Sequence, residues 1–131
     1  MQGESVYGSG MALSKGLAAT ANFIPLTDWR TTAGIKKLRA TLQMQGDTGT
    51  CLIAPAYQTI ETRTATGDTP VQIGALSFLG ANGFQYPTEF TDVSTDVTTK
   101  QLIRFGVLVK QDSDGGIQGC LASIKVEINI F

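Results

Sequence analysis

The most constraining feature of the sequence is a strict alternation of apolar and polar residues near its C-terminal end. Between positions 117 and 131 the residues of one parity are apolar: Cys120, Ala122, Ile124, Val126, Ile128 and Ile130. The residues of the other parity are polar: Ser123, Lys125, Glu127 and Asn129. A period of two is typical of a β-strand with one buried face and does not fit a helix. We therefore expect a long strand whose polar face meets water or a neighbouring subunit.

A second strand-like stretch, residues 101–110, precedes this strand. Residues 111–116 between them have the composition of a turn, so the two stretches are predicted to form a long β-hairpin. Alternate aspartates before a glycine, as in Asp112–Gly116, also open an EF-hand calcium loop. Here no glutamate follows at the required distance and no helices flank the loop. We interpret these residues as a turn and predict no metal site.

The rest of the chain shows turn signals about every ten residues, which is typical of a sandwich or barrel. We expect strands over 17–26, 35–45, 50–57 and 71–78, with a hairpin turn at 46–49. Pro55 indicates an edge strand or a bulge. Residues 27–34 could form one capped helical turn, and residues 88–99 a loop or weak edge strand. Trp29 precedes both cysteines, whereas the immunoglobulin pattern places its tryptophan between them. The predicted fold is therefore all-β, a two-sheet antiparallel β-sandwich of jelly-roll type.

The glycine-rich N-terminal segment, residues 1–16, is predicted to be an extended arm. The 131 residues otherwise make one domain, a β-sandwich over 17–131. An arm of this composition is readily ordered by lying on a neighbouring subunit, where it would add a strand to a sheet edge. We predict partner contacts at its apolar residues: Val6, Tyr7, Met11 and Leu13.

Composition excludes several classes of function. The chain has no histidine, so it cannot use Ser-His-Asp or Cys-His catalysis or a histidine metal site. Cys51 and Cys120 are interpreted as buried thiols, with a disulfide between the sheets as the alternative. The net charge is -1 and no basic block is present, so nucleic-acid and membrane-surface binding are disfavoured. No signal peptide or membrane span is visible, and we expect synthesis in the cytoplasm.

Few remaining residues suggest a site. The acidic residues stand mainly in turns and on polar strand faces, with no marked pair for glycoside hydrolysis, so we predict no enzyme and no cofactor. Trp29 fits a core or sandwich-edge position, or alternatively a sugar-stacking platform. Arg104 fits an edge protector or a paired interface residue. Further partner contacts are predicted at three aromatic residues: Phe84, Tyr86 and Phe131.

The chain as a whole resembles the small all-β structural proteins of tailed-bacteriophage virions, such as head decoration or cement proteins. The resemblance rests on the Met-Gln-Gly-Glu start, the glycine-rich arm, the missing histidine, the Thr/Gly/Ala-rich strands and the end Ile128-Asn-Ile-Phe131. It implies a non-enzymatic protein that binds a capsid lattice, often as a trimer, through arms and loops. Its partners would be further copies of itself and other virion proteins, and its location the virion, assembled in the host cytoplasm.

Two alternatives stay open. The chain could belong to a phage tail or neck rather than the head. It could instead be a carbohydrate-binding β-sandwich module that uses Trp29, Phe84 or Tyr86 as stacking platforms.

Overall fold

The computed structural model describes residues 3–13, 22–47, 51–73, 77–78, 85–111 and 121–131. These residues are almost entirely β-structure, with one helical turn, α1 (Ser94–Val97). The strands are β1 (Glu4–Leu13), β2 (Asn22–Pro25), β3 (Arg30–Thr31), β4 (Lys37–Asp47), β5 (Cys51–Ile60), β6 (Val71–Gln72), β7 (Ser77–Phe78), β8 (Gln85–Pro87), β9 (Thr91–Asp92), β10 (Leu102–Gln111) and β11 (Leu121–Ile130).

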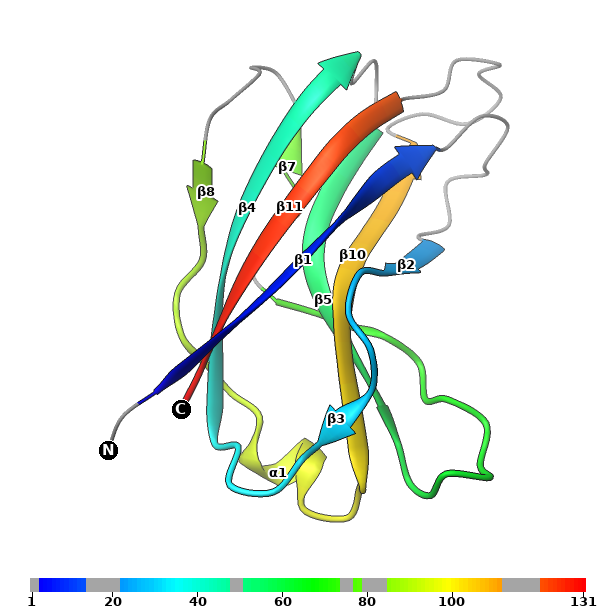
Figure 1. Ribbon diagram of the computed structural model, residues 1–131, viewed down its shortest axis with the longest axis vertical. Coiled ribbons are helices and arrows are strands. Elements are labelled where there is room, and N and C mark those ends of the chain that lie inside the picture. Colours follow the sequence, from blue (N-terminus) through cyan, green and yellow to red (C-terminus); the bar gives the residue numbers. More distant parts are fainter. Residues whose placement is uncertain (1–2, 14–21, 48–50, 74–76, 79–84, 112–120) are drawn as a thin grey trace.

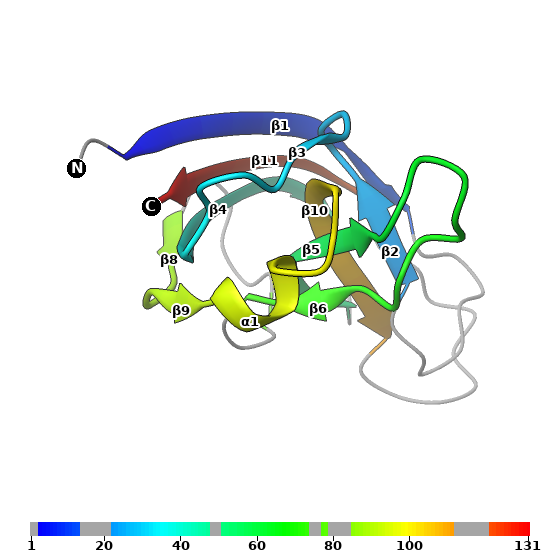
Figure 2. The same cartoon turned by 90° about the horizontal axis from the view of Figure 1, so that it is seen from below.

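The strands form two antiparallel sheets that pack face to face (Figures 1 and 2). Sheet A has the order β1-β11-β4-β8, and β9 also pairs with β4. Sheet B has the order β2-β10-β5-β6, with β3 on β10 and β7 on β5. If each interrupted pair of short strands counts as one strand, the first pairs with the eighth, the second with the seventh, the third with the sixth and the fourth with the fifth. This nested pairing is a jelly roll, which confirms the predicted fold class.

The core lies between the sheets and follows the predicted alternation. On β11 the side chains of Ile124, Val126, Ile128 and Ile130 are buried, while Ser123 and Lys125 are exposed. Sheet B supplies the opposite wall through fully buried side chains that include Ile53, Ile103, Phe105, Val107 and Val109. Burying one large apolar side chain contributes roughly 1.5–3 kcal/mol, so this layer supplies the main stabilisation of the fold.

Both predicted hairpins are wrong. β10 and β11 lie in different sheets, and so do β4 and β5 (Figure 1). β10 pairs with β2 and β5, whereas β11 pairs with β1 and β4. Alternation determines which face of a strand is buried, but it does not determine the neighbouring strand. A connection that crosses between two sheets uses the same turn residues as a hairpin, so composition alone suggested the shorter path.

The predicted N-terminal arm is extended, but its residues 4–13 belong to the sandwich. They form β1, which pairs with β11 along its whole length, from Glu4 opposite Ile130 to Leu13 opposite Leu121. The physical reason is that β11 needs hydrogen-bonding partners on both sides, and β1 satisfies the side that β4 leaves open. The expected boundary at residue 16 lies outside the described residues.

Three smaller expectations are corrected. The strand expected at 71–78 consists of two short strands, β6 and β7. Residues 27–34 form no helical turn: the Thr27 hydroxyl instead accepts a hydrogen bond from the Phe105 backbone N–H at 2.9 Å. The segment 88–99, expected to be a loop or a weak edge strand, contains the short edge strand β9 and the helical turn at 94–97.

Pro55 lies within β5, between β10 and the short strands of the opposite flank. The Pro55 carbonyl accepts a hydrogen bond from the Ile73 backbone N–H at 2.8 Å, just beyond the end of β6. The ring nitrogen of Pro55 therefore also faces the side of β5 on which β6 and β7 lie. The proline therefore removes no donor from the β5–β10 ladder.

Candidate interaction surface

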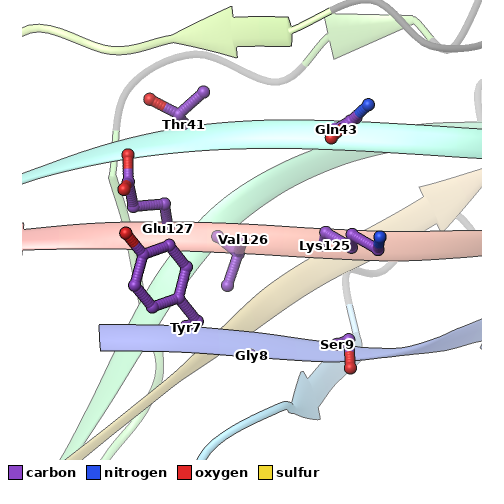
Figure 3. Close-up of a pocket in the computed structure, with 8 residues that line it drawn as sticks. All are labelled: Tyr7, Gly8, Ser9, Thr41, Gln43, Lys125, Val126 and Glu127. Carbon is purple, nitrogen blue, oxygen red and sulfur yellow. The ribbon is translucent and has the colours of Figure 1, made fainter. Parts of the chain in front are cut away.

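The outer face of sheet A carries a shallow groove of about 460 Å³ across β1, β11 and β4 (Figure 3). It exists because the polar parity of these strands points away from the core. Its lining is largely hydroxyl, amide and charged groups: Tyr7, Gly8, Ser9, Thr41, Gln43, Lys125, Val126 and Glu127. Such a lining can offer hydrogen bonds and one aromatic ring to a ligand.

Tyr7 dominates this groove, because 69% of it is exposed to solvent. It lies directly across from Glu127 in the β1–β11 ladder, and Figure 3 shows its ring beside that side chain. A hydrogen bond and the negative charge of the Glu127 carboxylate raise the pKa of Tyr7, because both favour the protonated phenol. The tyrosine is therefore neutral at physiological pH and presents its ring to solvent.

A second hollow, of about 670 Å³, lies beside β1 on the side away from β11. Its lining combines apolar residues with two arginines: Val6, Tyr7, Pro25, Leu26, Thr27, Asp28, Trp29, Arg30 and Arg104. The Arg30 guanidinium forms an ion pair with Glu4 of β1. The Nε atom of Arg30 is buried without a hydrogen-bond partner among the described residues.

Trp29 and Arg104 form a stacked pair at this edge of the sandwich. The Arg104 guanidinium lies 4.5 Å from the centre of the indole ring, and its Nε donates to Gln58 Oε1 at 2.8 Å. Arg104 stands on β10, which has neighbours on both sides, so it does not protect a sheet edge. Trp29 is half-buried, and the arginine covers one face of its ring. The structure thus places Trp29 at the sandwich edge, with one stacking face occupied.

The C-terminal residue Phe131 packs within the chain. Its backbone bonds to Lys37 in both directions, extending the β11–β4 ladder. Its ring meets the Phe90 ring edge-on at 5.0 Å between centroids, and the Lys37 ammonium lies 4.9 Å from the Phe90 centroid. A Cβ on Gly3 would come within 2.5 Å of the Phe131 ring, so the backbone of Gly3 also packs against this ring.

The predicted contact residues do not form one surface. Val6 and Tyr7 lie on β1, and Phe131 follows β11 at the same end of the ladder where Glu4 pairs. Tyr86 stands on β8, at the opposite edge of sheet A. The side chains of Met11, Leu13 and Tyr86 and the whole of Phe84 lie outside the described residues. Their contact with a partner therefore stays a prediction.

Sequence reasoning missed the contribution of β4 to the groove. Thr41 and Gln43 alternate with the apolar residues Ala40, Leu42 and Met44 in the sequence, and this alternation was the available signal. Their position next to Lys125 and Glu127 depends on β4 pairing with β11, and that pairing is remote in sequence.

Several carboxylates have structural partners. Asp96 accepts a hydrogen bond from the buried Tyr57 hydroxyl at 2.5 Å. Asp68 accepts from the Thr59 hydroxyl at 2.8 Å and pairs with the Lys100 ammonium at 2.9 Å, and these contacts lower its pKa. No cluster of three metal-binding side chains occurs among the described residues. None of the helical structure in the described segments is long and apolar enough to span a membrane.

Comparison with known proteins identifies the fold. No protein-family model matches the chain, and no curated protein matches it. Solved structures do match: the structure of infectious bursal disease virus Gx strain, at 15% identity and a TM-score of 0.55, covers 98% of this chain. The VP2 subviral particle of the same virus matches at 13% identity with a TM-score of 0.56, and the T13 viral particle matches at 13% identity with a TM-score of 0.57. Each match again covers 98% of this chain.

The shared feature is the fold. This chain spans about a third of the length of those proteins: 32%, 33% and 31% of the three matched chains. The single jelly roll described above is therefore similar to one part of a larger viral capsid protein.

Proposed function

We propose that this chain is a non-enzymatic structural component of a virus particle, and more narrowly a decoration or cement protein of a bacteriophage head. The observation that carries the proposal is the match of the whole jelly roll to capsid proteins of an icosahedral virus. The groups described on its surface also fit this role, because the groove and the hollow offer hydrogen-bonding and apolar groups to a partner.

The partners under this proposal are further copies of the chain and other virion proteins. β1 and the exposed groove of sheet A provide the contact surface on one side of the sandwich. Neither surface carries the basic stripe that a phosphate backbone requires, since Lys125 stands beside Glu127 on the same strand.

Co-expression with the major capsid protein of the same genome tests this function. The chain should co-sediment with assembled heads in a density gradient and be visible on them by electron microscopy at a fixed ratio to the shell protein. It should also delay disassembly of the heads on heating. Heads that form and melt identically without the chain, and that never carry it, would contradict the proposal.

A carbohydrate-binding role is the second candidate, and one observation favours it. Tyr7 is an exposed aromatic ring in a groove lined by hydroxyl, amide and carboxylate groups, the combination that sugar recognition uses. Trp29 is less suited, because Arg104 covers one face of its ring. Binding to immobilised neutral glycans that is lost in Tyr7→Ala and kept in Tyr7→Phe would support this candidate; no binding by the wild-type chain would remove it.

A further inference from the structure

The four edges of the two sheets differ sharply in how they are protected. Three edges are made of short, interrupted strands: β8 with β9, β2 with β3, and β6 with β7, each strand being two to four residues long. Two of these edges also carry a proline, Pro87 on β8 and Pro25 on β2. Short strands and prolines prevent a sheet from adding a further strand.

β1 forms the fourth edge and has none of these features. It is ten residues long, continuous, and without proline. No charged residue stands between Ser5 and Gly10, and the charge of Glu4 is neutralised by its ion pair with Arg30. A long, flat, uncharged edge is a template for pairing with another strand.

The outward-facing backbone groups of this edge can be assigned from the ladder. Phe131 and Lys37 exchange hydrogen bonds in both directions, so Phe131 faces β4 and the preceding Ile130 faces β1. Ile130 is opposite Glu4, and facing directions alternate along a strand. The N–H and C=O groups of Ser5, Tyr7 and Ser9 therefore point away from β11, toward the side on which none of the described strands pairs with β1.

We propose that β1 pairs antiparallel with β1 of a second copy of this chain about a two-fold axis at Tyr7. This register places Ser5 opposite Ser9 of the partner subunit and Tyr7 opposite Tyr7 of the partner subunit. About six backbone hydrogen bonds join the copies, two for each facing pair. Sheet A then continues across both molecules in the order β8-β4-β11-β1-β1-β11-β4-β8, with each β9 also paired with its own β4.

The sequence of β1 suits a second copy as the occupant. Within β1 (Glu4–Leu13), Ser5 and Ser9 are the same residue on either side of Tyr7, and in this register Glu4 faces Gly10 of the partner subunit, so no like charges meet. The two Tyr7 rings lie side by side on the outer face. That contact covers the most exposed of the large hydrophobic side chains among the described residues, now 69% exposed. An aromatic cross-strand pair favours the contact further.

The hollow beside β1 adjoins the proposed contact on the inner face. Leu26 already packs on Gly8 there, since its Cβ lies only 2.8 Å from where a Gly8 Cβ would be. Val6, Pro25 and Leu26 of the first copy line the apolar part of that hollow. Val6 of the partner subunit comes opposite Gly8 and therefore adds an apolar residue beside Leu26.

Charge-swap variants test the pairing and its register. Ser5→Lys/Ser9→Lys places lysines opposite lysines across the two-fold axis, and Ser5→Glu/Ser9→Glu does the same with glutamates. Each alone should dimerise roughly tenfold more weakly than the wild type, because like charges directly opposite are destabilising. An equimolar mixture should form heterodimers at least as strong as the wild-type dimer. Sedimentation equilibrium from about 10 μM to about 1 mM covers the relevant range of affinities.

The matched control is Ser123→Lys/Thr99→Lys, which adds two lysines at exposed positions away from the β1 edge, one on β11 and one shortly before β10. It should dimerise like the wild type. Thermal unfolding of every variant establishes that the fold is intact. The double glutamate variant should be more stable than the double lysine variant, because position 9 lies opposite Lys125 within the same chain.

Three outcomes overturn the proposal: a wild-type chain that stays monomeric to about 1 mM, a dimer insensitive to both charge variants, or a mixture that fails to form heterodimers. If β1 pairs only with a strand of a different protein, the chain alone stays monomeric, which is the first of these outcomes. The pairing does not depend on the virion function. Dimers without binding to heads would contradict that function alone, whereas heads carrying the chain without this pairing would contradict the dimer alone.

Discussion

Gly106 on β10 and Ile24 on β2 approach each other so closely that a Cβ on Gly106 would lie 2.1 Å from the Ile24 carbonyl oxygen. Gly106 stands opposite Pro25 in the ladder, at the point where β2 ends. The contact is with backbone atoms, which cannot rotate away as a flexible side chain can. The absence of a side chain at position 106 therefore allows β2 to pair with β10 at the edge of sheet B.

Gly106→Ala should consequently destabilise the fold by about 3 kcal/mol, the upper part of the range for overpacked sites. Urea unfolding followed by tryptophan fluorescence measures the change. Gly10→Ala is the control, because its Cβ would meet only the terminal Cδ2 methyl of Leu26, at 2.6 Å, and should cost less than about 1 kcal/mol. Equal losses in the two variants would show that the close approach to Ile24 has no special weight.

Tyr57 and Asp96 connect the core to the helical turn α1. The Tyr57 ring is 1% exposed, and its hydroxyl donates to the Asp96 carboxylate at 2.5 Å. Tyr57→Phe should lower the free energy of unfolding at pH 7 by about 1–2 kcal/mol, since a hydrogen bond to a charged group is lost while the exposed Asp96 is hydrated. Tyr7→Phe, at an exposed position, should leave the urea midpoint at pH 7 unchanged.

Alkaline pH provides a second measurement on Tyr57. Burial and the Asp96 carboxylate raise the pKa of Tyr57 above its ordinary value of 10.0. Above pH 10 the unfolded chain loses this proton while the folded chain keeps it, so stability falls as the pH rises, by at most about 1.4 kcal/mol per pH unit for this group. Tyr57→Phe should show a shallower loss between pH 10 and 11. An unchanged slope would mean that this tyrosine ionises alike in both states.

Asp68 ties the loop after β5 to the segment before β10. The Lys100 ammonium and the Thr59 hydroxyl hold the pKa of Asp68 below its ordinary value. The stability from this contact is present above the unfolded pKa and disappears as the pH falls through the folded pKa. Asp68→Asn should lower the urea midpoint slightly at pH 7, and the difference from wild type should vanish near pH 2. Asp28→Asn is a control at an exposed acid, and a midpoint shift that persists at low pH would contradict the ion-pair explanation.

Trp29 is the only tryptophan, so its fluorescence reports directly on Arg104. Arg104→Ala uncovers one face of the indole ring and removes the bond to Gln58. Acrylamide quenching of the folded protein should increase, and stability should fall by about 1–2 kcal/mol through the lost stacking and hydrogen bond. Arg63→Ala, at an exposed arginine, should change neither. Unaltered quenching in Arg104→Ala would mean that the guanidinium does not shield the ring.

The faces of the long strands were predictable from the sequence, whereas the partners of those strands were not. The alternation from Ile124 to Ile130 is a local property, because each side chain only has to point into or out of the core. The position of Tyr7 opposite Glu127 joins residues at the two ends of the chain, and no local pattern encodes it. The pairing of residues 4–13 with β11, within the segment predicted to be an arm, was missed for the same reason. A glycine-rich segment seemed too weakly patterned for a strand, yet Gly8 is required where β1 crosses Leu26.

The central place of β11 in sheet A has a consequence for synthesis. β1 and β4 are not neighbours; each pairs with β11. On the ribosome β1 therefore emerges early but has no native partner until Leu121–Ile130 have left the exit tunnel. During that interval the nascent chain displays unpaired strands and open apolar faces, the conditions under which chains aggregate or recruit chaperones. Sheet A can therefore be completed only after β11 has emerged, and slowing translation ahead of β11 should lower the soluble yield.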